Sequence, residues 1–235
     1  MTKRLFALLL VLTLVVSMLP VGVLAESMVA AIDSSAALIE AMQNGGSIKL
    51  TADIVLEGVA QIPAGKTVVL DLNGKTISST NEAYHIANAG TLTIIDSREG
   101  GKDGEIKMTP ASESAAVSAL KNTGKLTING GKITTTTKSK TAQAVYSEAS
   151  SVTINGGTFE ANYNATGGSS AYTIVLLGDT SGSSVATING GTFIAKSRST
   201  ANSRCAAVFA NCDSTKKITI TINGGTFEGS RDGYR

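Results

Sequence analysis

Apolar and polar residues alternate in short runs along this chain, and the runs recur at regular intervals. Leu126–Ile128, Val152–Ile154, Ala186–Ile188 and Ile220–Ile222 each place an apolar residue, a Thr and an Ile before an Asn-Gly-Gly corner. The motif Thr-Ile-Asn-Gly-Gly therefore occurs four times, with separations of 26, 34 and 34 residues. A repeat of this length predicts a stacked array, because one unit alone cannot bury its apolar face.

Weaker copies of the motif extend the array toward the N-terminus. Thr93–Asp96 lies 34 residues before the first full motif, and Asp71–Gly74 lies 22 residues before that. Each later unit also has a strand-like run after the glycines and a third run further on. The third runs are Ala144–Tyr146, Thr173–Leu177 and Ala206–Ala210. Three short strands per unit predict a coil of triangular section, with equivalent strands about 4.8 Å apart.

Strand alternation separates inward from outward positions in these units. The Ile of each motif points inward and the preceding Thr outward. A column of inward residues is expected after the glycines: Ile133, Phe159, Phe193 and Phe227. Each buried Phe contributes about 1.5–3 kcal/mol. The motif asparagines, Asn129, Asn155, Asn189 and Asn223, favour a structural role: Asn tolerates the corner conformation, and stacked amides bond along a column.

The region before the array predicts a short helix. Ser35–Gln43 follows the capping candidates Asp33 and Ser34, and Asn44-Gly45-Gly46 ends the pattern. Leu38, Ile39 and Met42 share one face, which suits a plug over the open end of an apolar core. We therefore expect a cap region over residues 26–46 and a β-helix domain over residues 47–235. The last unit lacks a cap helix, so we expect the domain to be truncated or uncapped there and its open edge to self-associate.

Residues 1–25 have the form of a secretory signal. Lys3 and Arg4 precede the apolar run Leu5–Val16, and Ala25 ends a candidate cleavage site. Secretion, an extracellular or cell-surface location and no membrane span after cleavage are expected. Without Lys3 and Arg4, 18 basic residues remain against 18 acidic ones. This balance argues against nucleic acid as a partner.

Composition supports an all-β chain with many turns, since Gly numbers 25, Pro 3 and Trp 0. Cys205 and Cys212 flank a predicted strand of about 23 Å, whereas a disulfide needs Cα atoms about 4.4–6.8 Å apart. No bond is expected between them. With the distant His85 they form no metal-ligand set, and no cofactor is expected.

These repeats, together with Ile62–Lys66 and Leu70–Ile77, resemble those of a known family. The units are similar to right-handed parallel β-helices of the pectin-lyase-like superfamily, and more narrowly to secreted bacterial proteins with TINGGTF rungs. The resemblance covers residues 35–235. It implies an all-β, right-handed, single-stranded parallel β-helix with three strands per coil, roughly six coils and a short N-terminal capping helix. One fold hosts many functions, so the activity does not follow from it.

Catalytic residues of the superfamily's enzymes are not found. Polygalacturonases of that superfamily carry Asn-Thr-Asp, Asp-Asp, Gly-His-Gly and Arg-Ile-Lys stretches. Only Asn211–Asp213 faintly resembles the first. Glu160 and Glu228 occupy equivalent outward positions, but Ile194 lies between them, so a carboxylate pair for hydrolysis is not expected. A fragment of a polysaccharide lyase or glycoside hydrolase remains an alternative.

A binding surface is predicted where the longer units extend beyond the minimal coil. Asn162–Ala171 and Lys196–Arg204 should emerge at the same corner of successive coils, and loops on a rigid scaffold commonly carry binding. The candidate glycan-binding residues there are Tyr163, Lys138, Lys140, Lys196, Arg198 and Arg204. Tyr163 would stack on a sugar and the cations would pair with carboxylates or sulfates.

The sequence thus favours a non-catalytic β-helix module, acting as an adhesin, stalk or glycan-binding unit with a polysaccharide or cell-surface glycan as partner. An ice-binding face ranks last. The pairs Thr91/Thr93 and Thr219/Thr221 suit one, but Lys125, Ser151 and Val185 interrupt the outward grid.

Overall fold

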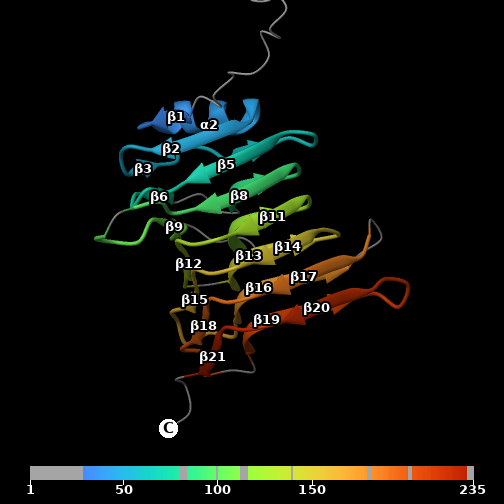
Figure 1. The fold of residues 1–235 in the computed structure, drawn as a ribbon. Helices are drawn as coiled ribbons and strands as arrows, with labels where there is room; N and C mark the ends of the chain where they lie inside the picture. The colour runs from blue at the N-terminus through green and yellow to red at the C-terminus, as the bar shows by residue number, and fades with distance from the viewer. Residues whose placement is uncertain are drawn as a thin grey trace, which may run out of the picture.

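Three parallel sheets wind around one core in the computed structural model, which describes residues 29–79, 84–98, 100–111, 116–138, 140–178, 182–200 and 203–231. The proposed signal peptide, residues 1–25, lies outside these ranges. Successive strands belong to successive sheets, so the chain forms a right-handed parallel β-helix, as predicted (Figure 1). Six coils have all three strands, and a seventh has two.

The first sheet has eight strands: β1 (Val29–Ile32), β2 (Gly46–Leu50), β5 (Thr67–Asp71), β8 (Thr91–Ile95), β11 (Lys125–Ile128), β14 (Ser151–Ile154), β17 (Ser184–Ile188) and β20 (Ile218–Ile222). The second has seven: β3 (Ile54–Val55), β6 (Thr76–Ser79), β9 (Glu105–Met108), β12 (Lys132–Thr137), β15 (Thr158–Tyr163), β18 (Thr192–Ser197) and β21 (Thr226–Arg231). The third has six: β4 (Ala60–Ile62), β7 (Tyr84–Asn88), β10 (Val117–Asn122), β13 (Ala142–Glu148), β16 (Ala171–Gly178) and β19 (Cys205–Cys212).

The coils stack in the register that the motif spacing predicts. Ile128 pairs with Ile154, and Ile154 pairs with Ile188, in β11, β14 and β17. In the second sheet Ile133 pairs with Phe159, and Phe159 with Phe193. Because equivalent residues lie one above another, the core consists of continuous files of apolar side chains.

The Phe file runs to the end of the described chain. Phe159 and Phe193 are fully buried, and Phe193 also stacks on Phe227 at 4.9 Å between ring centroids. Phe227 is 39% exposed and Ile222 53% exposed. Both lie in coil seven, whose strands β20 and β21 are the last of their sheets, so no described strand covers their far side.

The Asn-Gly-Gly corners carry the expected amide ladder. Asn155, Asn189 and Asn223 each donate a side-chain hydrogen bond of 2.7 Å to the Asn of the preceding coil. The second glycine of each corner has a positive φ, for example +103° at Gly157. A side chain there would be strained, which explains the glycine.

A short helix covers the N-terminal end of the core. α2 (Ser35–Asn44) extends one residue beyond the predicted helix, and Leu38 and Met42 are fully buried. Ser34 is the N-cap residue but makes no side-chain capping bond, and Gly45 ends the helix with φ +84°. β1 adds a strand that the sequence did not predict, and it pairs with β2. No helix in the described ranges is long and apolar enough to cross a membrane.

Candidate functional site

The predicted binding edge lies where the second sheet turns into the third. β12, β15 and β18 end at Thr137, Tyr163 and Ser197, and the next strand of each coil begins a few residues later. The backbone ladder continues past these ends: Asn164 N–H donates to Thr137 O at 2.8 Å, and Arg198 N–H donates to Tyr163 O at 3.0 Å. The connections therefore emerge at one corner, as predicted.

This continued ladder aligns Lys138, Asn164 and Arg198 in one file along the corner. The Arg198 guanidinium donates to the Asn164 side-chain oxygen at 3.1 Å. Lys138 is exposed at the start of the file. Two cations with an amide between them give the corner a positive, hydrogen-bonding rim.

A hollow of about 350 Å³ lies beside that file. Its lining consists of Thr136, Asn162, Tyr163, Asn164, Lys196 and Arg198. Lys196 and Arg198 supply its positive charge, although the Lys196 ammonium also lies 4.0 Å from a Glu228 carboxylate oxygen. Amide, hydroxyl and cationic groups around a concave surface are suited to hydrogen bonding with a polar ligand.

Tyr163 does not have the role that the sequence suggested. Its residue is only 3% exposed, and its side chain packs in a small second core with Ala142, Ala161, Ala171 and Ala195. A ring buried in this way cannot stack on a sugar, so the predicted stacking is wrong. Tyr163 instead supports the hollow from below.

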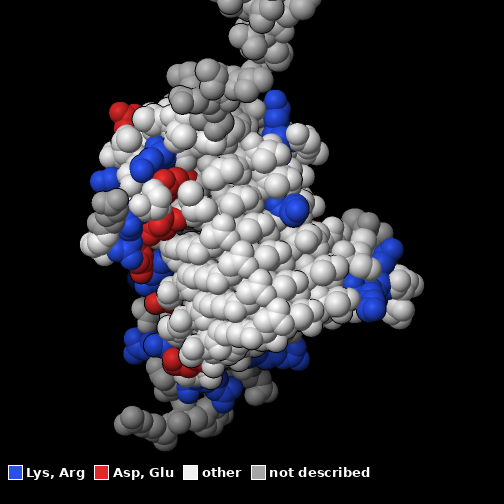
Figure 2. All heavy atoms as spheres, viewed as in Figure 1, with Lys and Arg blue, Asp and Glu red and all other residues white. Residues whose placement is uncertain are grey.

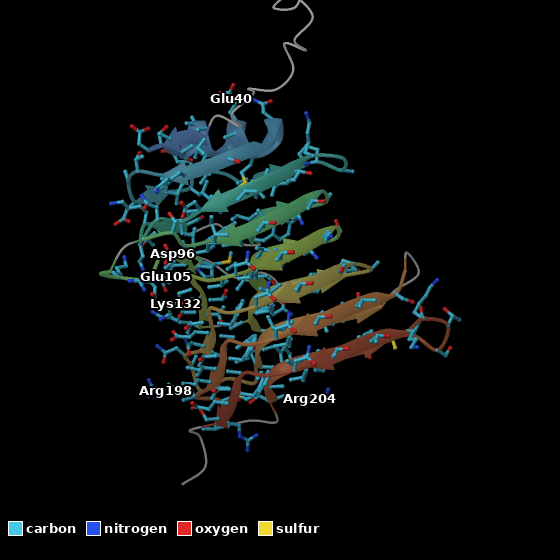
Figure 3. All side chains as sticks on the ribbon, in the orientation of Figure 1. Glu40, Asp96, Glu105, Lys132, Arg198 and Arg204 are labelled. Carbon is cyan, nitrogen blue, oxygen red and sulfur yellow. The ribbon has the colours of Figure 1, made fainter. Side chains whose placement is uncertain are left out.

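The six predicted residues do not form one cluster. Arg198 and Arg204 lie at the two ends of the connection between β18 and β19 (Figure 3). Arg204 is exposed, and its backbone bonds to Ala171 and Ser170 fix it beside the third sheet. Lys140 precedes β13 at the same end of the corner, where its carbonyl accepts a bond from Thr137. Tyr163, Lys196 and Arg198 thus share the hollow, whereas Lys140 and Arg204 lie just before the starts of β13 and β19.

An ion-pair cluster on the second sheet was not predicted. The Lys132 ammonium lies 3.0 Å from Glu160 and 4.0 Å from Glu105, and Thr134 donates to Glu105 at 2.7 Å. Glu105 and Lys132 are labelled on one side of the molecule in Figure 3. Lys132 lies near both carboxylates and offsets one of their two negative charges, and the cluster links coils three to five. Glu160 and Glu228 are separated by Ile194 in the register, as predicted.

The outer face of the third sheet carries aromatic side chains that were not predicted from the sequence. The Lys121 ammonium lies 5.5 Å from the ring centroid of Tyr84 and 6.0 Å from that of Tyr146. In the next coils Tyr172 and Phe209 stack at 4.6 Å between centroids. Tyr84, Lys121, Tyr146 and Phe209 are half-buried, and Tyr172 is 8% exposed.

The first sheet presents a broad face with little charge, while charged side chains lie along its margin (Figure 2). Thr127, Thr153 and Thr187 form an outward file in register there. The neighbouring file holds Lys125, Ser151 and Val185, so the interruption of the Thr grid is confirmed. An open trough of about 920 Å³ follows the glycine corners of the same sheet.

The acidic side chains at the N-terminal end of that trough make hydrogen bonds and ion pairs within the protein. Asp96 accepts backbone N–H bonds from Gly74 at 2.7 Å and Gly104 at 2.8 Å, and it pairs with Arg98. Arg98 also pairs with Asp103. Within the described ranges, no group of three or more His, Cys, Asp or Glu side chains could hold a metal ion.

His85 and Cys212 lie away from the candidate edge, whereas Cys205 follows Arg204 at that edge and packs against the small core of Tyr163. His85 is buried in β7, and its Nε2 donates to Lys107 O at 2.8 Å, while Nδ1 has no partner. Burial lowers the pKa of His85 below its ordinary value, although the bond to Lys107 opposes this shift. Cys205 and Cys212 lie at opposite ends of β19 and form no disulfide with each other, as predicted.

Comparison of the chain with protein-family models, curated proteins and solved structures gave no significant match.

Proposed function

We propose that this chain is a secreted, non-catalytic β-helix module that binds a polysaccharide or cell-surface glycan. The observation that carries the proposal is the hollow beside the file of Lys138, Asn164 and Arg198. It combines a concave shape with two cations, two side-chain amides and a hydroxyl. Amides and hydroxyls hydrogen-bond to sugar hydroxyls, and Lys196 and Arg198 pair with carboxylate or sulfate groups.

The repeat along the axis also suits a linear glycan. Successive coils present equivalent corner positions about 4.8 Å apart, so one polymer chain can contact several coils at once. Several weak contacts then add up to useful avidity without a deep pocket. The TINGGTF rungs support a relation to the pectin-lyase-like superfamily, and the basic and apolar start of the chain supports secretion.

The test compares binding to acidic polysaccharides at low salt, since exposed charges are screened at high salt. The parent chain is compared with the triple variant Lys196→Gln, Arg198→Gln, Arg204→Gln. The matched control removes three other exposed cations, by Lys66→Gln, Lys125→Gln and Lys217→Gln, from the corner between the third and first sheets. Weaker binding by the first variant alone is expected.

Equal binding by all three proteins would remove the edge as a glycan site. An assay for reducing ends and unsaturated products on the same polysaccharides tests the absence of catalysis. Product formation above background would overturn the non-catalytic proposal in favour of a lyase or hydrolase.

A further inference from the structure

The outer face of the third sheet brings aromatic side chains from successive coils into one band. Register pairs place the following residues one below another from coil two to coil six: Ala87, Lys121, Tyr146, Val175 and Phe209. A parallel file beside it contains Tyr84, Ser118, Gln143, Tyr172 and Ala206. Every coil from two to six therefore contributes an aromatic ring or Lys121 to this face.

Tyr84, Lys121 and Tyr146 form the most specific part of the band. Lys121 belongs to the coil between those of the two tyrosines, and its ammonium is within about 6 Å of both rings, the range of cation–π attraction. The two rings orient the lysine, while the half-buried side chains leave surface for a ligand. Two coil rises of about 4.8 Å separate the tyrosines along the axis.

Polar groups border the rings on both sides. A hollow of about 300 Å³ includes Gln61, Tyr84, Lys121 and Thr123 in its lining. On the neighbouring file Ser118 and Gln143 are buried and Ser118 donates to Gln143 at 2.7 Å, so the amide and hydroxyl open to a ligand are those of Gln61 and Thr123. Apolar ring faces beside amides and hydroxyls match a sugar ring, which has a C–H-rich face and a hydroxyl-rich edge. Tyrosine suits such a surface because its ring is apolar and its hydroxyl stays at the wet rim.

We propose that this band binds a linear acidic polysaccharide laid along the helix axis. Sugar rings pack on Tyr84 and Tyr146, and the ammonium of Lys121 pairs with an anionic substituent between them. The occupant is anionic because the cation Lys121 lies between the two tyrosine rings of the band. Glu148 lies on the same face by strand alternation and limits the anionic part of the ligand to the neighbourhood of Lys121.

This inference rests on the proposed glycan-binding function and names a second surface for it. The basic corner and the aromatic band lie on either side of the same connections, which end at β13, β16 and β19. A single polymer can contact both surfaces, with charge dominating at the corner and ring packing at the band. Separate variants are therefore needed to tell the two apart.

The experiment measures binding by affinity electrophoresis and by tyrosine fluorescence, since the chain has no Trp. The probes are polygalacturonate for carboxylates, dextran sulfate for sulfates and a neutral galactan. The variants are Tyr84→Ala, Tyr146→Ala and Lys121→Gln, with Lys125→Gln as the matched control from the first sheet. Circular dichroism confirms that each variant is folded.

Tyr84→Ala and Tyr146→Ala should each weaken binding of an anionic probe at least about tenfold, as expected for aromatic anchors of an interface. Lys121→Gln should weaken it at least about fivefold at low salt and have little effect on the galactan. Lys125→Gln should bind like the parent. The probe that responds to Lys121 identifies the anionic group.

The outcomes separate this inference from the proposed function. Parent-like binding by all three band variants, with loss of binding in the corner triple variant, overturns the band and leaves the corner site standing. Weaker binding by the band variants, with parent-like binding by the corner variant, supports the band and removes the corner. No binding of any probe by the parent overturns both. An unchanged affinity of Lys121→Gln for both anionic probes overturns the acidic ligand.

Discussion

Phe159 and Phe193 stack face to face in successive coils, with ring centroids 4.8 Å apart and planes within 5° of each other. Both rings are fully buried, and Phe193 stacks on Phe227 from the other side. Such parallel stacking is set by the coil rise, because equivalent side chains repeat at the strand spacing of about 4.8 Å. The aromatic file therefore reports directly on whether the coils are in register.

Truncating the middle of this file should destabilise the fold. Phe193→Ala removes a fully buried ring with a partner on both sides, and we expect the free energy of unfolding to fall by about 3–5 kcal/mol. Urea unfolding followed by circular dichroism measures it. Phe227→Ala is the matched control, because Phe227 is 39% exposed and should cost clearly less. Equal losses of unfolding free energy in the two variants would contradict the stacked core.

The exposed asparagine ladder should make a smaller contribution. Asn155 donates to Asn129 and accepts from Asn189, so Asn155→Ala breaks two bonds. At about 0.5–1.5 kcal/mol for each bond, the expected loss is about 1–3 kcal/mol. Asn223→Ala breaks the single ladder bond to Asn189 and should lower the free energy of unfolding by about half as much. Unfolding midpoints of the two variants test this ratio, and no loss in either would leave the ladder without a stabilising role.

The repeats predicted the coil because the same alternation recurs after each corner. Ile128, Phe159 and the asparagines could be placed from spacing alone, since a parallel register puts equivalent residues side by side. Strand alternation also predicts that Tyr163 is buried, because it lies four residues after Phe159 in β15 and therefore on the same inward side. Tyr163 was predicted to lie in a loop with its ring exposed, whereas it is the last residue of β15 and its ring is buried.

The third sheet could not be predicted in the same way. In β10, the consecutive residues Ala119 and Leu120 are both fully buried, so strict alternation fails inside the strand. Side-chain direction after such a bend depends on packing rather than on position in the repeat. The outward direction of Tyr146 and Lys121 therefore emerged only from the structure, and with it the aromatic band.

Short strands without a full motif could not be predicted from the sequence either. β4 has three residues and shows no recognisable period. β1 was missed because its sequence, Val-Ala-Ala-Ile, has no alternation. The ion pair of Lys132 with Glu160 could have been found from the 26-residue spacing, which brings the two strands into register.

The first and second glycine positions of the Asn-Gly-Gly corners should respond differently to substitution. Gly157 has φ +103°, and a Cβ added there would lie 2.8 Å from the carbonyl oxygen of Gly131. Gly157→Ala should therefore destabilise the protein by about 1–3 kcal/mol. Gly130 is the matched control: its added Cβ would meet nothing nearer than 3.9 Å. Gly130→Ala should be near neutral or stabilise by about 0.4–1 kcal/mol.

Thermal and urea unfolding of both glycine variants measure this difference in stability. Equal stability of the two would show that the positive φ of Gly157 is not required for the corner. A loss of stability in Gly130→Ala alone would show that the first glycine of the Asn-Gly-Gly turn, rather than the second, cannot accept a side chain.

The stability of the fold should depend on pH through His85, the only histidine in the chain. Burial lowers its pKa below the ordinary value of 6.5. As pH falls below 6.5, the unfolded chain takes up a proton that the folded protein does not, so the free energy of unfolding falls. The decline amounts to at most about 1.4 kcal/mol per pH unit and stops once the folded protein also becomes protonated.

Urea unfolding at about pH 7.5 and about pH 5, on protein without a histidine tag, measures this change in the free energy of unfolding. His85→Gln should lose the part of the pH dependence that begins near 6.5, even if its stability at neutral pH is lower because the bond to Lys107 changes. Identical pH dependence of the parent and the variant would show that His85 does not titrate differently on folding.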